Sequence, residues 1–339
     1  MELLILPQQI RVTLDAGRSL LEAALKARVH LPHSCRGGSC GACRAHLVSG
    51  DVHYPQGRTL GLDHAESAAG EILMCQAVAL TDVTVEILTI RPTDEAEVKS
   101  LPCRVQRLER LSPDVMAVFL RLPAVESFVF RAGQYVDVLL PGHRRRSFSI
   151  ASPQEETALL ELHVRRVEGG VFTTRVFEEF KVGTLLHIEG PLGRFVYAGG
   201  REGPLLLVAG GTGFAPLKSM MSMLLKQGIT RPIRLYWGVR TAADLYQREW
   251  VEAQVRQCPA LSFVPVFSGS MDRTSGCRTG LVHEALIADY PDLSAVEVYA
   301  AGPPEMIAAL ASAVSAHGCP REHFHADAFE YAVDSRGVY

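Results

Sequence analysis

The sequence lacks a large excess of charge of either sign. It has 34 lysine and arginine residues against 37 aspartate and glutamate residues, which gives a formal net charge of −3. Such a balance provides no general attraction for nucleic acid or for an anionic membrane. We therefore expect neither as a partner, and a charged partner would have to meet a local patch.

Long apolar segments are missing as well. No stretch approaches the roughly 20 apolar residues that a membrane-spanning helix needs. The N-terminal segment has Glu2 where a secretory signal has basic residues, and its apolar run stops at Pro7. From these absences we expect a soluble protein of the cytoplasm.

The length and composition indicate several folded domains. A chain of 339 residues exceeds what one core usually organises, and 47% hydrophobic with 21% charged residues is ordinary for a globular protein. Eight cysteines do not indicate a disulfide scaffold here, because such scaffolds belong to short secreted chains. Reduced thiols or metal ligands are expected instead.

The first part of the chain predicts a small β-rich unit with one helix, over residues 1–92. Residues 9–14 alternate in polarity, and Ser19 with Glu22 matches a capping box for a helix to about Arg28. Val83, Val85 and Ile87 alternate as a closing strand. The charged, proline-bearing segment that follows predicts a linker over 93–99.

Two further domains follow. Residues 100–199 contain short strand candidates at 115–122, 135–140, 148–150 and 160–164, with a helix near 173–180, and regular short strands favour an antiparallel barrel. Residues 200–331 alternate apolar strands at 205–209, 233–237, 261–266 and 296–300 with helical stretches such as 306–316. This alternation predicts a doubly wound α/β domain, which leaves 332–339 as a tail.

The strongest motif is a group of four cysteines. Cys35, Cys40, Cys43 and the distant Cys75 give the C-x4-C-x2-C spacing of a plant-type [2Fe–2S] cluster. Glycines between the first three permit unusual backbone angles and a close approach of amides to sulfur. Zinc is the alternative, but zinc sites more often use two C-x2-C pairs or add histidines. The remaining cysteines match no ligand spacing and are expected to be buried: Cys103, Cys258, Cys277 and Cys319.

Two segments of the barrel favour a flavin dinucleotide. Arg146, Ser147, Phe148 and Ser149 end a basic run that enters a predicted strand; a basic run alone is often only solvated surface. Glycines followed by threonine at a helix start, in the segment 169–174, offer amides and a positive helix end to a pyrophosphate.

A glycine-rich turn favours a nicotinamide dinucleotide in the last domain. The apolar run 205–209 leads into residues 210–216, GGTGFAP, where backbone amides can cradle phosphate. The next predicted strand ends at Arg240 without the acid that an ordinary Rossmann dehydrogenase places on the ribose. A second glycine turn, at Gly302 and Pro303, follows a later strand at the edge where such sheets bind ligands.

These motifs together resemble the ferredoxin–NADP reductase superfamily, in its members with an N-terminal plant-type ferredoxin domain. The resemblance runs to about Tyr331 and comprises, in order, CRGGSCGAC, RSFSI, GGVFT, GGTGFAP, YWGVR, AAGPPEM and FHADAF. Similar reductases act on CDP-6-deoxy-3,4-glucoseen or serve Rieske-type aromatic dioxygenases, such as the terephthalate type. The resemblance implies a multidomain α+β and α/β protein: a β-grasp [2Fe–2S] ferredoxin domain, a Greek-key antiparallel β-barrel for FAD, and a Rossmann-like domain for NADH, with NADPH possible.

The resemblance also implies roles for individual residues. Arg146 would bind FAD phosphate, Phe148 would stack on the flavin, and Ser149 would hydrogen-bond near flavin N5. The pyrophosphate segment and the nicotinamide loop, with other cofactor-binding residues on the same domains, comprise Ser147, His163, Arg165, Gly170, Val171, Phe172, Thr173, Gly211, Thr212, Gly213, Arg240, Gly302 and Pro303. Of all these, Ser149 and Thr212, together with the C-terminal aromatic Phe329, are assigned to catalysis.

Two positions depart from the family pattern. Phe148 replaces the usual tyrosine, which should preserve stacking and lose a hydroxyl contact. Ala301 stands where many relatives have a cysteine. We expect hydride transfer to proceed with alanine there, because the flavin carries the chemistry and the protein positions it.

The combined domains predict an NADH-dependent reductase that sends electrons through FAD and the cluster to a separate protein. A nicotinamide gives up two electrons as hydride whereas a [2Fe–2S] cluster accepts one, so an intervening flavin is needed. The acceptor is expected to be the oxygenase component of a Rieske-type dioxygenase, or alternatively a CDP-sugar dehydratase. A redox-sensing or binding module without turnover is the alternative of another class. Preference for NADH follows the resemblance, although Arg240, Arg273 and Arg278 offer charges for a 2′-phosphate.

Overall fold

The computed structural model describes the chain apart from residues 28, 30, 32, 34–37, 39–40, 42, 56, 58–60, 63, 88–97, 125–126, 270–277 and 330–339. The chain divides into two compact units, Met1–Glu95 and Ala96–Tyr339. The second unit contains both the barrel and the α/β domain that the sequence separates. None of the helices in the described part of the chain combines the length and hydropathy needed to cross a membrane.

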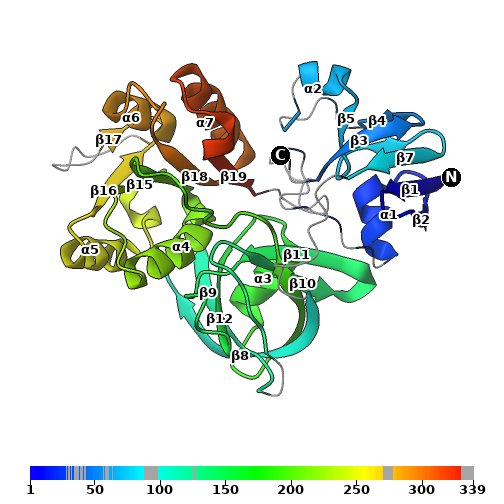
Figure 1. The fold of residues 1–339 in the computed structure, drawn as a ribbon. Helices are drawn as coiled ribbons and strands as arrows, with labels where there is room; N and C mark the ends of the chain where they lie inside the picture. Colours follow the sequence, from blue (N-terminus) through cyan, green and yellow to red (C-terminus); the bar gives the residue numbers. More distant parts are fainter. Residues whose placement is uncertain are drawn as a thin grey trace. The chain divides into compact units, whose positions relative to one another are not determined.

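The first unit is built on a five-stranded mixed sheet in the order β2-β1-β7-β3-β5. Strand β1 pairs in parallel with β7 and antiparallel with β2, and α1 packs four buried residues onto the sheet's core. This arrangement agrees with the predicted β-grasp fold. Its elements are β1 Glu2–Leu6, β2 Ile10–Thr13, α1 Leu20–Lys26, β3 Arg44–Ser49, β4 Val52–His53, α2 His64–Ala68, β5 Glu71–Leu73, β6 Val78–Ala79 and β7 Val83–Glu86 (Figure 1).

Helix α1 begins where the sequence predicts. Ser19 Oγ accepts a hydrogen bond from Glu22 N at 3.2 Å, and Glu22 Oε2 accepts one from Ser19 N at 3.2 Å. This reciprocal capping satisfies two amides that a helix start otherwise leaves unpaired. The helix ends at Lys26, and the predicted end at Arg28 lies outside the described residues.

The barrel is a six-stranded antiparallel sheet in the order β11-β10-β13-β8-β9-β12. An antiparallel bridge between Ile150 and Leu162 joins its two edges, so the sheet closes on itself as predicted. Strand β8 begins at Lys99, the last residue of the predicted linker. The elements are β8 Lys99–Arg110, β9 Val115–Arg121, β10 Tyr135–Leu140, η1 Pro141–His143, β11 Arg144–Ser149, β12 Leu159–Arg165, α3 Val171–Glu178 and β13 Leu185–Leu192.

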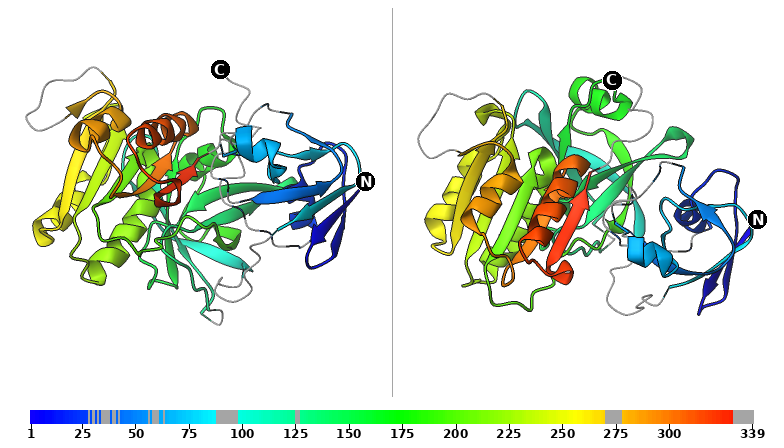
Figure 2. Two further views of the ribbon diagram at one scale, coloured as in Figure 1. Left: turned by 45° about the horizontal axis from the view of Figure 1, so that its top comes forward. Right: turned by 90° about the horizontal axis from the view of Figure 1, so that it is seen from above.

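The α/β domain is a sheet in the order β17-β16-β15-β14-β18-β19, parallel in every pairing. Helices α4 and α5 pack on one face, and α6 and α7 pack on the other (Figures 1 and 2). The doubly wound prediction is therefore confirmed. The elements are β14 Leu205–Gly210, η2 Gly211–Gly213, α4 Phe214–Lys226, β15 Ile233–Val239, η3 Ala242–Asp244, α5 Arg248–Gln257, β16 Leu261–Phe267, β17 Arg278–Thr279, α6 Val282–Asp289, β18 Glu297–Gly302, α7 Pro304–Ala316, η4 Arg321–His323 and β19 Phe324–Ala328.

Candidate functional site

Strand pairing brings two of the four predicted cluster ligands together. Cys43 directly precedes β3 and Cys75 follows β5, and these strands pair antiparallel with Arg44 opposite Leu73. Both thiols are buried, Cys43 at 5% and Cys75 at 7% exposure. Buried thiols at neighbouring strand ends suit the ligation of iron by thiolates, so this pair fits a [2Fe–2S] cluster.

The other two predicted ligands, Cys35 and Cys40, lie outside the described residues. Met74 N donates to Cys43 O at 3.0 Å, which fixes the backbone of the two described ligands to each other. The position of Cys43 relative to Cys75 is thus set by the sheet register of β3 and β5.

Glycines shape the loop before Cys43 as predicted. Gly38 and Gly41 have φ values of 79° and 69°, which side chains with a Cβ rarely adopt. Gly38 O accepts a hydrogen bond from Gly61 N at 2.7 Å, and Arg44 Nη2 donates to Gly61 O at 2.9 Å. Because Arg44 also pairs with Glu66, it ties both Gly61 and Glu66 to the start of β3.

The remaining cysteines differ in burial. Cys103 is 3% exposed and Cys319 8%, and burial raises the pKa of the Cys103 thiol to about 12. Cys258 is half-buried, contrary to the expectation of full burial, and Cys277 lies outside the described residues. Cys103, Cys258 and Cys319 belong to the second compact unit, whereas Cys43 and Cys75 belong to the first. This agrees with the sequence, in which these three cysteines match no ligand spacing.

Two aromatic side chains join the predicted flavin segments. The rings of Phe148 on β11 and Phe172 on α3 have centroids 5.5 Å apart. Ser149 ends β11 and is buried at 9% exposure, and Ser147 Oγ donates to Asp137 Oδ1 at 2.6 Å. The fold thus places RSFS and the first turn of α3 side by side, as one dinucleotide would require.

The three arginines of the basic run have different partners. Arg145 pairs with Glu189 and lies 3.5 Å from Asp137 Oδ2. Arg144 Nε donates to Pro141 O at 3.2 Å, and Arg146 Nη1 donates to Arg145 O at 2.7 Å. Asp137 and Glu189 thus both engage Arg145. Of the other two arginines, Arg144 is exposed and Arg146 is half-buried.

The start of α3 can receive an anion. Gly170 is its N-cap, and no side chain caps the first turn. Thr173 Oγ1 instead accepts a hydrogen bond from Val167 N at 3.1 Å and donates to Gly170 O at 3.2 Å, which holds the preceding turn. Val171, at 53% exposure, faces outward. The first-turn amides and the positive helix end fit a pyrophosphate.

His163 is engaged on both ring nitrogens. Nε2 lies 2.9 Å from Glu161 Oε1, and Nδ1 lies 3.0 Å from Tyr246 Oη. A polar contact from His163 to a flavin would break one of these hydrogen bonds. We therefore do not retain His163 among the proposed FAD-binding residues.

Arg165 lies where the barrel meets the nicotinamide loop. Its Nε is 3.1 Å from Asp114 Oδ2. A Cβ added to Gly211 would come within 2.8 Å of Arg165 Nη1. This contact puts a guanidinium beside backbone that is expected to bind phosphate, and a half-exposed charge there fits a dinucleotide anion.

The two predicted glycine turns meet at one point of the parallel sheet. Strand β14 lies between β15 and β18, so the strand order reverses at β14. The turn Gly211–Gly213 follows β14, and Gly302 with Pro303 follows β18, so both turns lie at the carboxyl ends of adjacent strands. A crevice at such a reversal is the general ligand site of these folds.

Two glycines at this point have no room for a side chain. A Cβ on Gly213 would lie 1.9 Å from Ala301 O, and one on Gly302 would lie 3.0 Å from Gly210 Cα. Trp237 Nε1 donates to Gly211 O at 2.9 Å and fixes the loop from β15. The two glycines therefore allow the backbone of the loop to pack closely against β18. This packing fixes the backbone of the loop, and with it the amide of Thr212.

Phe329 also reaches the reversal point. Its backbone N donates to Gly302 O at 2.8 Å, directly after β19. Ala301 beside it is fully buried, and its backbone carbonyl contacts Gly213. The C-terminal aromatic and the alanine that departs from the family pattern are therefore neighbours of the nicotinamide loop.

The residues after β15 show a feature that the sequence reading missed. Asp244 Oδ2 accepts hydrogen bonds from Thr241 N at 2.8 Å and from Thr241 Oγ1 at 3.0 Å, so an acid does lie beyond β15. The spacing Thr241-x-x-Asp244 is itself a capping-box signal. Arg240 is exposed, and Arg278 pairs with Asp289, so Arg278 is already engaged.

Comparison with protein families agrees with this geometry. Residues 4–80 match the 2Fe-2S iron-sulfur cluster binding domain, residues 102–197 match the oxidoreductase FAD-binding domain, and residues 207–312 match the oxidoreductase NAD-binding domain. The three matches follow one another along the chain in the order of the three folds described above. The cofactors of this chain are accordingly a [2Fe–2S] cluster, FAD and NAD(P)H.

Relatives extend over nearly the whole chain. The CDP-6-deoxy-L-threo-D-glycero-4-hexulose-3-dehydrase reductase of Yersinia pestis is 37% identical over 95% of this chain and 96% of its own. Terephthalate 1,2-dioxygenase reductase component 2 of a Comamonas species is 34% identical over 92% of each chain. The crystal structure of the Amycolatopsis cytochrome P450 reductase GcoB superposes with a TM-score of 0.77 at 33% identity, covering 97% of this chain and 98% of that one.

Domain order, site geometry and full-length similarity lead to one assignment. The chain belongs to the ferredoxin–NADP reductase superfamily, among the members that add an N-terminal plant-type [2Fe–2S] domain, and it is an NAD(P)H-dependent iron–sulfur flavoprotein reductase.

Proposed function

We propose that this reductase takes electrons from NADH and delivers them singly, through its own cluster domain, to a separate acceptor protein. The observation that carries this proposal is the buried pair Cys43 and Cys75, brought together by β3 and β5 in the same chain as the two dinucleotide domains. A chain that only moved hydride between NADH and a small molecule would not need a one-electron centre.

The proposed FAD site uses the barrel residues. Arg146 and the first-turn amides of α3 hold phosphate, Phe148 packs against the ring system, and Ser149 offers its hydroxyl at the end of β11. Bound FAD supplies acceptance of two electrons and their release one at a time.

The proposed NADH site uses the reversal point of the parallel sheet. The Gly211–Gly213 turn, with Thr212, and the Gly302–Pro303 turn bind the dinucleotide, while Arg165 supplies positive charge from the barrel. Phe329, tied to Gly302 through its backbone, covers the position where the nicotinamide meets the flavin.

For the acceptor we propose the oxygenase component of an aromatic-ring dioxygenase. The similarity to the Comamonas terephthalate 1,2-dioxygenase reductase component supports this choice, with 92% of each chain aligned. A dehydrase acting on a CDP-linked sugar is the second candidate, because the Yersinia pestis dehydrase reductase is 37% identical.

The two acceptors are separated by direct titration. Purified holoenzyme with NADH is mixed with increasing amounts of a Rieske oxygenase component or of a CDP-sugar dehydrase, and NADH oxidation is followed. Saturable stimulation by the oxygenase component, absent with the dehydrase, is the expected result. Stimulation by the dehydrase alone would select the second candidate, and a holoenzyme that does not oxidise NADH with any electron acceptor would contradict the reductase function.

Arg146→Ala is expected to weaken FAD binding by roughly 10- to 100-fold, the loss typical of one charge-assisted hydrogen bond to phosphate. Fluorescence titration of apoprotein with FAD measures the change. Arg144→Ala is the matched control, since Arg144 lies two residues away on the same face of β11. Equal losses in both variants would contradict a specific role for Arg146.

Asp244→Asn is expected to reduce the preference for NADH over NADPH by about tenfold, because the carboxylate beyond β15 repels a 2′-phosphate and can accept from a ribose hydroxyl. The ratio of kcat/KM for the two nucleotides is the measurement. Asparagine keeps the size and an acceptor oxygen for Thr241, so the turn is preserved. An unchanged ratio would remove Asp244 from the nucleotide site.

A further inference from the structure

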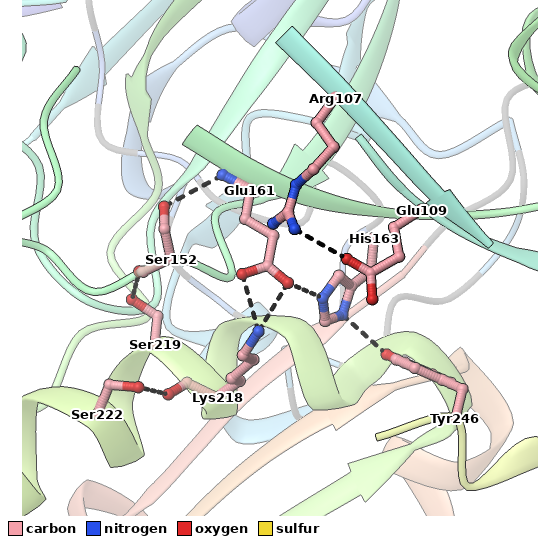
Figure 3. A network of polar contacts seen from close by, with 9 residues as sticks. All are labelled: Arg107, Glu109, Ser152, Glu161, His163, Lys218, Ser219, Ser222 and Tyr246. Atoms are coloured by element: carbon pink, nitrogen blue, oxygen red, sulfur yellow. Dashed lines mark hydrogen bonds and ion pairs between the residues drawn. The ribbon is translucent and has the colours of Figure 1, made fainter. Parts of the chain in front are cut away.

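A chain of polar side chains crosses from the barrel to the α/β domain (Figure 3). Glu161 and His163 come from β12, Lys218 comes from α4, and Tyr246 lies between η3 and α5. Lys218 Nζ donates to the two carboxylate oxygens of Glu161 at 2.6 and 2.8 Å. His163 links Glu161 to Tyr246 through its two ring nitrogens, at 2.9 and 3.0 Å. We refer to these four residues as the bridge.

The charges of the bridge are buried and fixed. His163 has a fully buried side chain, and those of Lys218 and Glu161 are 9% exposed. Burial alone would raise the pKa of Glu161, but the hydrogen bond from His163 and the positive charge of Lys218 hold it below its ordinary value. Burial lowers the pKa of His163 and raises that of Tyr246.

These protonation states give each hydrogen bond a direction. An ionised carboxylate only accepts, so Nε2 of a neutral His163 carries the proton and Nδ1 accepts from the Tyr246 hydroxyl. The Glu161 carboxylate thus accepts from both Lys218 and His163, and His163 accepts from Tyr246.

Stability alone does not account for such a bridge. Taking an ion pair out of water costs about as much as the pair returns, and well-packed apolar residues are often as stable. Interfaces between domains of one chain also tend to allow relative motion. The buried pair of Lys218 and Glu161, with its hydrogen bonds to His163, instead fixes how the barrel and the α/β domain are positioned against each other.

The bridge and the nicotinamide loop share the same neighbours. Lys218 lies five residues after Gly213 on the helix that the loop starts. The Tyr246 ring packs edge-on against Trp237 with centroids 5.2 Å apart, and Trp237 Nε1 donates to Gly211 O. On the barrel side, Arg165 follows His163 on β12, and its guanidinium lies where a Cβ on Gly211 would point. Gly211 is thus hydrogen-bonded by Trp237 within its own domain and approached by Arg165 from the barrel.

We propose that Lys218 and Glu161 are positioning residues for hydride transfer, holding the Gly211–Gly213 loop in register with the barrel so that nicotinamide meets flavin at the reacting distance. The inference rests on the dinucleotide sites proposed above. Neither residue touches the reacting atoms in this account; both act through the loop.

A neutral contact at the same interface provides a control. Ser219, next to Lys218 on α4, donates through Oγ to Ser152 O of the barrel at 2.7 Å. Ser152 Oγ in turn accepts from Glu161 N at 3.2 Å, but Ser219→Ala removes one contact between the domains and leaves every side-chain hydrogen bond of the bridge in place. It is expected to cost some stability and to leave the rate of flavin reduction at the wild-type value.

The test is stopped-flow reduction of the bound flavin by NADH in the holoenzyme, with the limiting rate and the Kd for NADH fitted separately. Lys218→Met should lower the limiting rate at least about tenfold, since misplacement of reacting groups by a fraction of an ångström is costly. The Kd should change less than about threefold, because the loop amides remain. Lys218→Arg, which keeps the charge and two donors, should restore most of the rate.

The double variant Lys218→Met/Glu161→Gln distinguishes a loss of loop positioning from a general loss of stability, because it removes the ion pair and leaves no unpaired buried charge. The proposal expects it to recover thermal stability and to remain slow. A double variant that is stable and reduces flavin at the wild-type rate would overturn the proposal, as would Ser219→Ala slowed as much as Lys218→Met. Absence of NADH-driven flavin reduction in the wild type would instead overturn the reductase function and the inference with it.

Discussion

Cys75→Ser is expected to abolish reduction of an acceptor protein while NADH still reduces the flavin at close to the wild-type rate. Cys75 is the proposed fourth ligand and stands alone in the sequence, so no neighbouring cysteine can replace it. The dinucleotide domains belong to the other compact unit. Acceptor reduction should fall at least about a hundredfold, because the one-electron exit is lost.

Two measurements on the same sample separate these effects. Stopped-flow absorbance reports flavin reduction, and steady-state cytochrome c reduction reports electron exit. Cys258→Ser is the control, since Cys258 is a half-buried thiol of the α/β domain. A Cys75→Ser protein that keeps its iron and its cytochrome c reductase activity would contradict the assignment of the fourth ligand.

Gly213→Ala is expected to slow NADH-driven flavin reduction at least about a hundredfold, the scale of a 1 Å displacement of reacting groups. The new Cβ would lie 1.9 Å from Ala301 O and 2.4 Å from Ala301 C. Both are backbone atoms, so the loop has to move away from β18. Reduction of the flavin by dithionite does not need the loop and should be unaffected.

Gly238→Ala is the matched control for this substitution. Gly238 lies in the neighbouring strand β15, and the atoms nearest to its added Cβ belong to the side chain of Val282, at 3.1 Å and beyond. Its rate of flavin reduction should stay near that of the wild type. A Gly213→Ala protein that reduces flavin as fast as Gly238→Ala would show that the loop does not position the nucleotide.

Local signals allowed much of the fold to be predicted from the sequence. The capping box of Ser19 and Glu22 set the start of α1, and the apolar run ending at Gly210 indicated a strand of a parallel sheet. Strand β10 begins and ends as predicted over residues 135–140. Strand β1 was missed because residues 2–6 show no alternation of polarity, although Leu3 and Ile5 are buried.

The candidate site could be predicted only where a motif is contiguous. The glycine turns at 211–213 and 302 were recognisable, but their meeting at one edge depends on the order of the strands. The bridge was not predictable, because Glu161 and Lys218 are 57 residues apart and neither belongs to a motif. The same reason explains His163, whose partners Glu161 and Tyr246 come from different domains.

One local signal was available and not used. Thr241 and Asp244 have the spacing of a capping box. This spacing indicates an acid just beyond β15, where the sequence analysis expected none. The position of Ala301 is also clearer in the structure. Its backbone carbonyl, rather than its side chain, packs on Gly213, so an alanine satisfies this contact as well as a cysteine would.

Anaerobic addition of NADH to the holoenzyme, followed by electron paramagnetic resonance with iron and sulfide analysis, shows whether electrons pass from the flavin to a [2Fe–2S] cluster. We expect two irons and two inorganic sulfides per chain, and a reduced cluster that forms after the flavin is reduced. A single zinc ion in place of iron, or a cluster that stays oxidised while NADH is consumed, would contradict it.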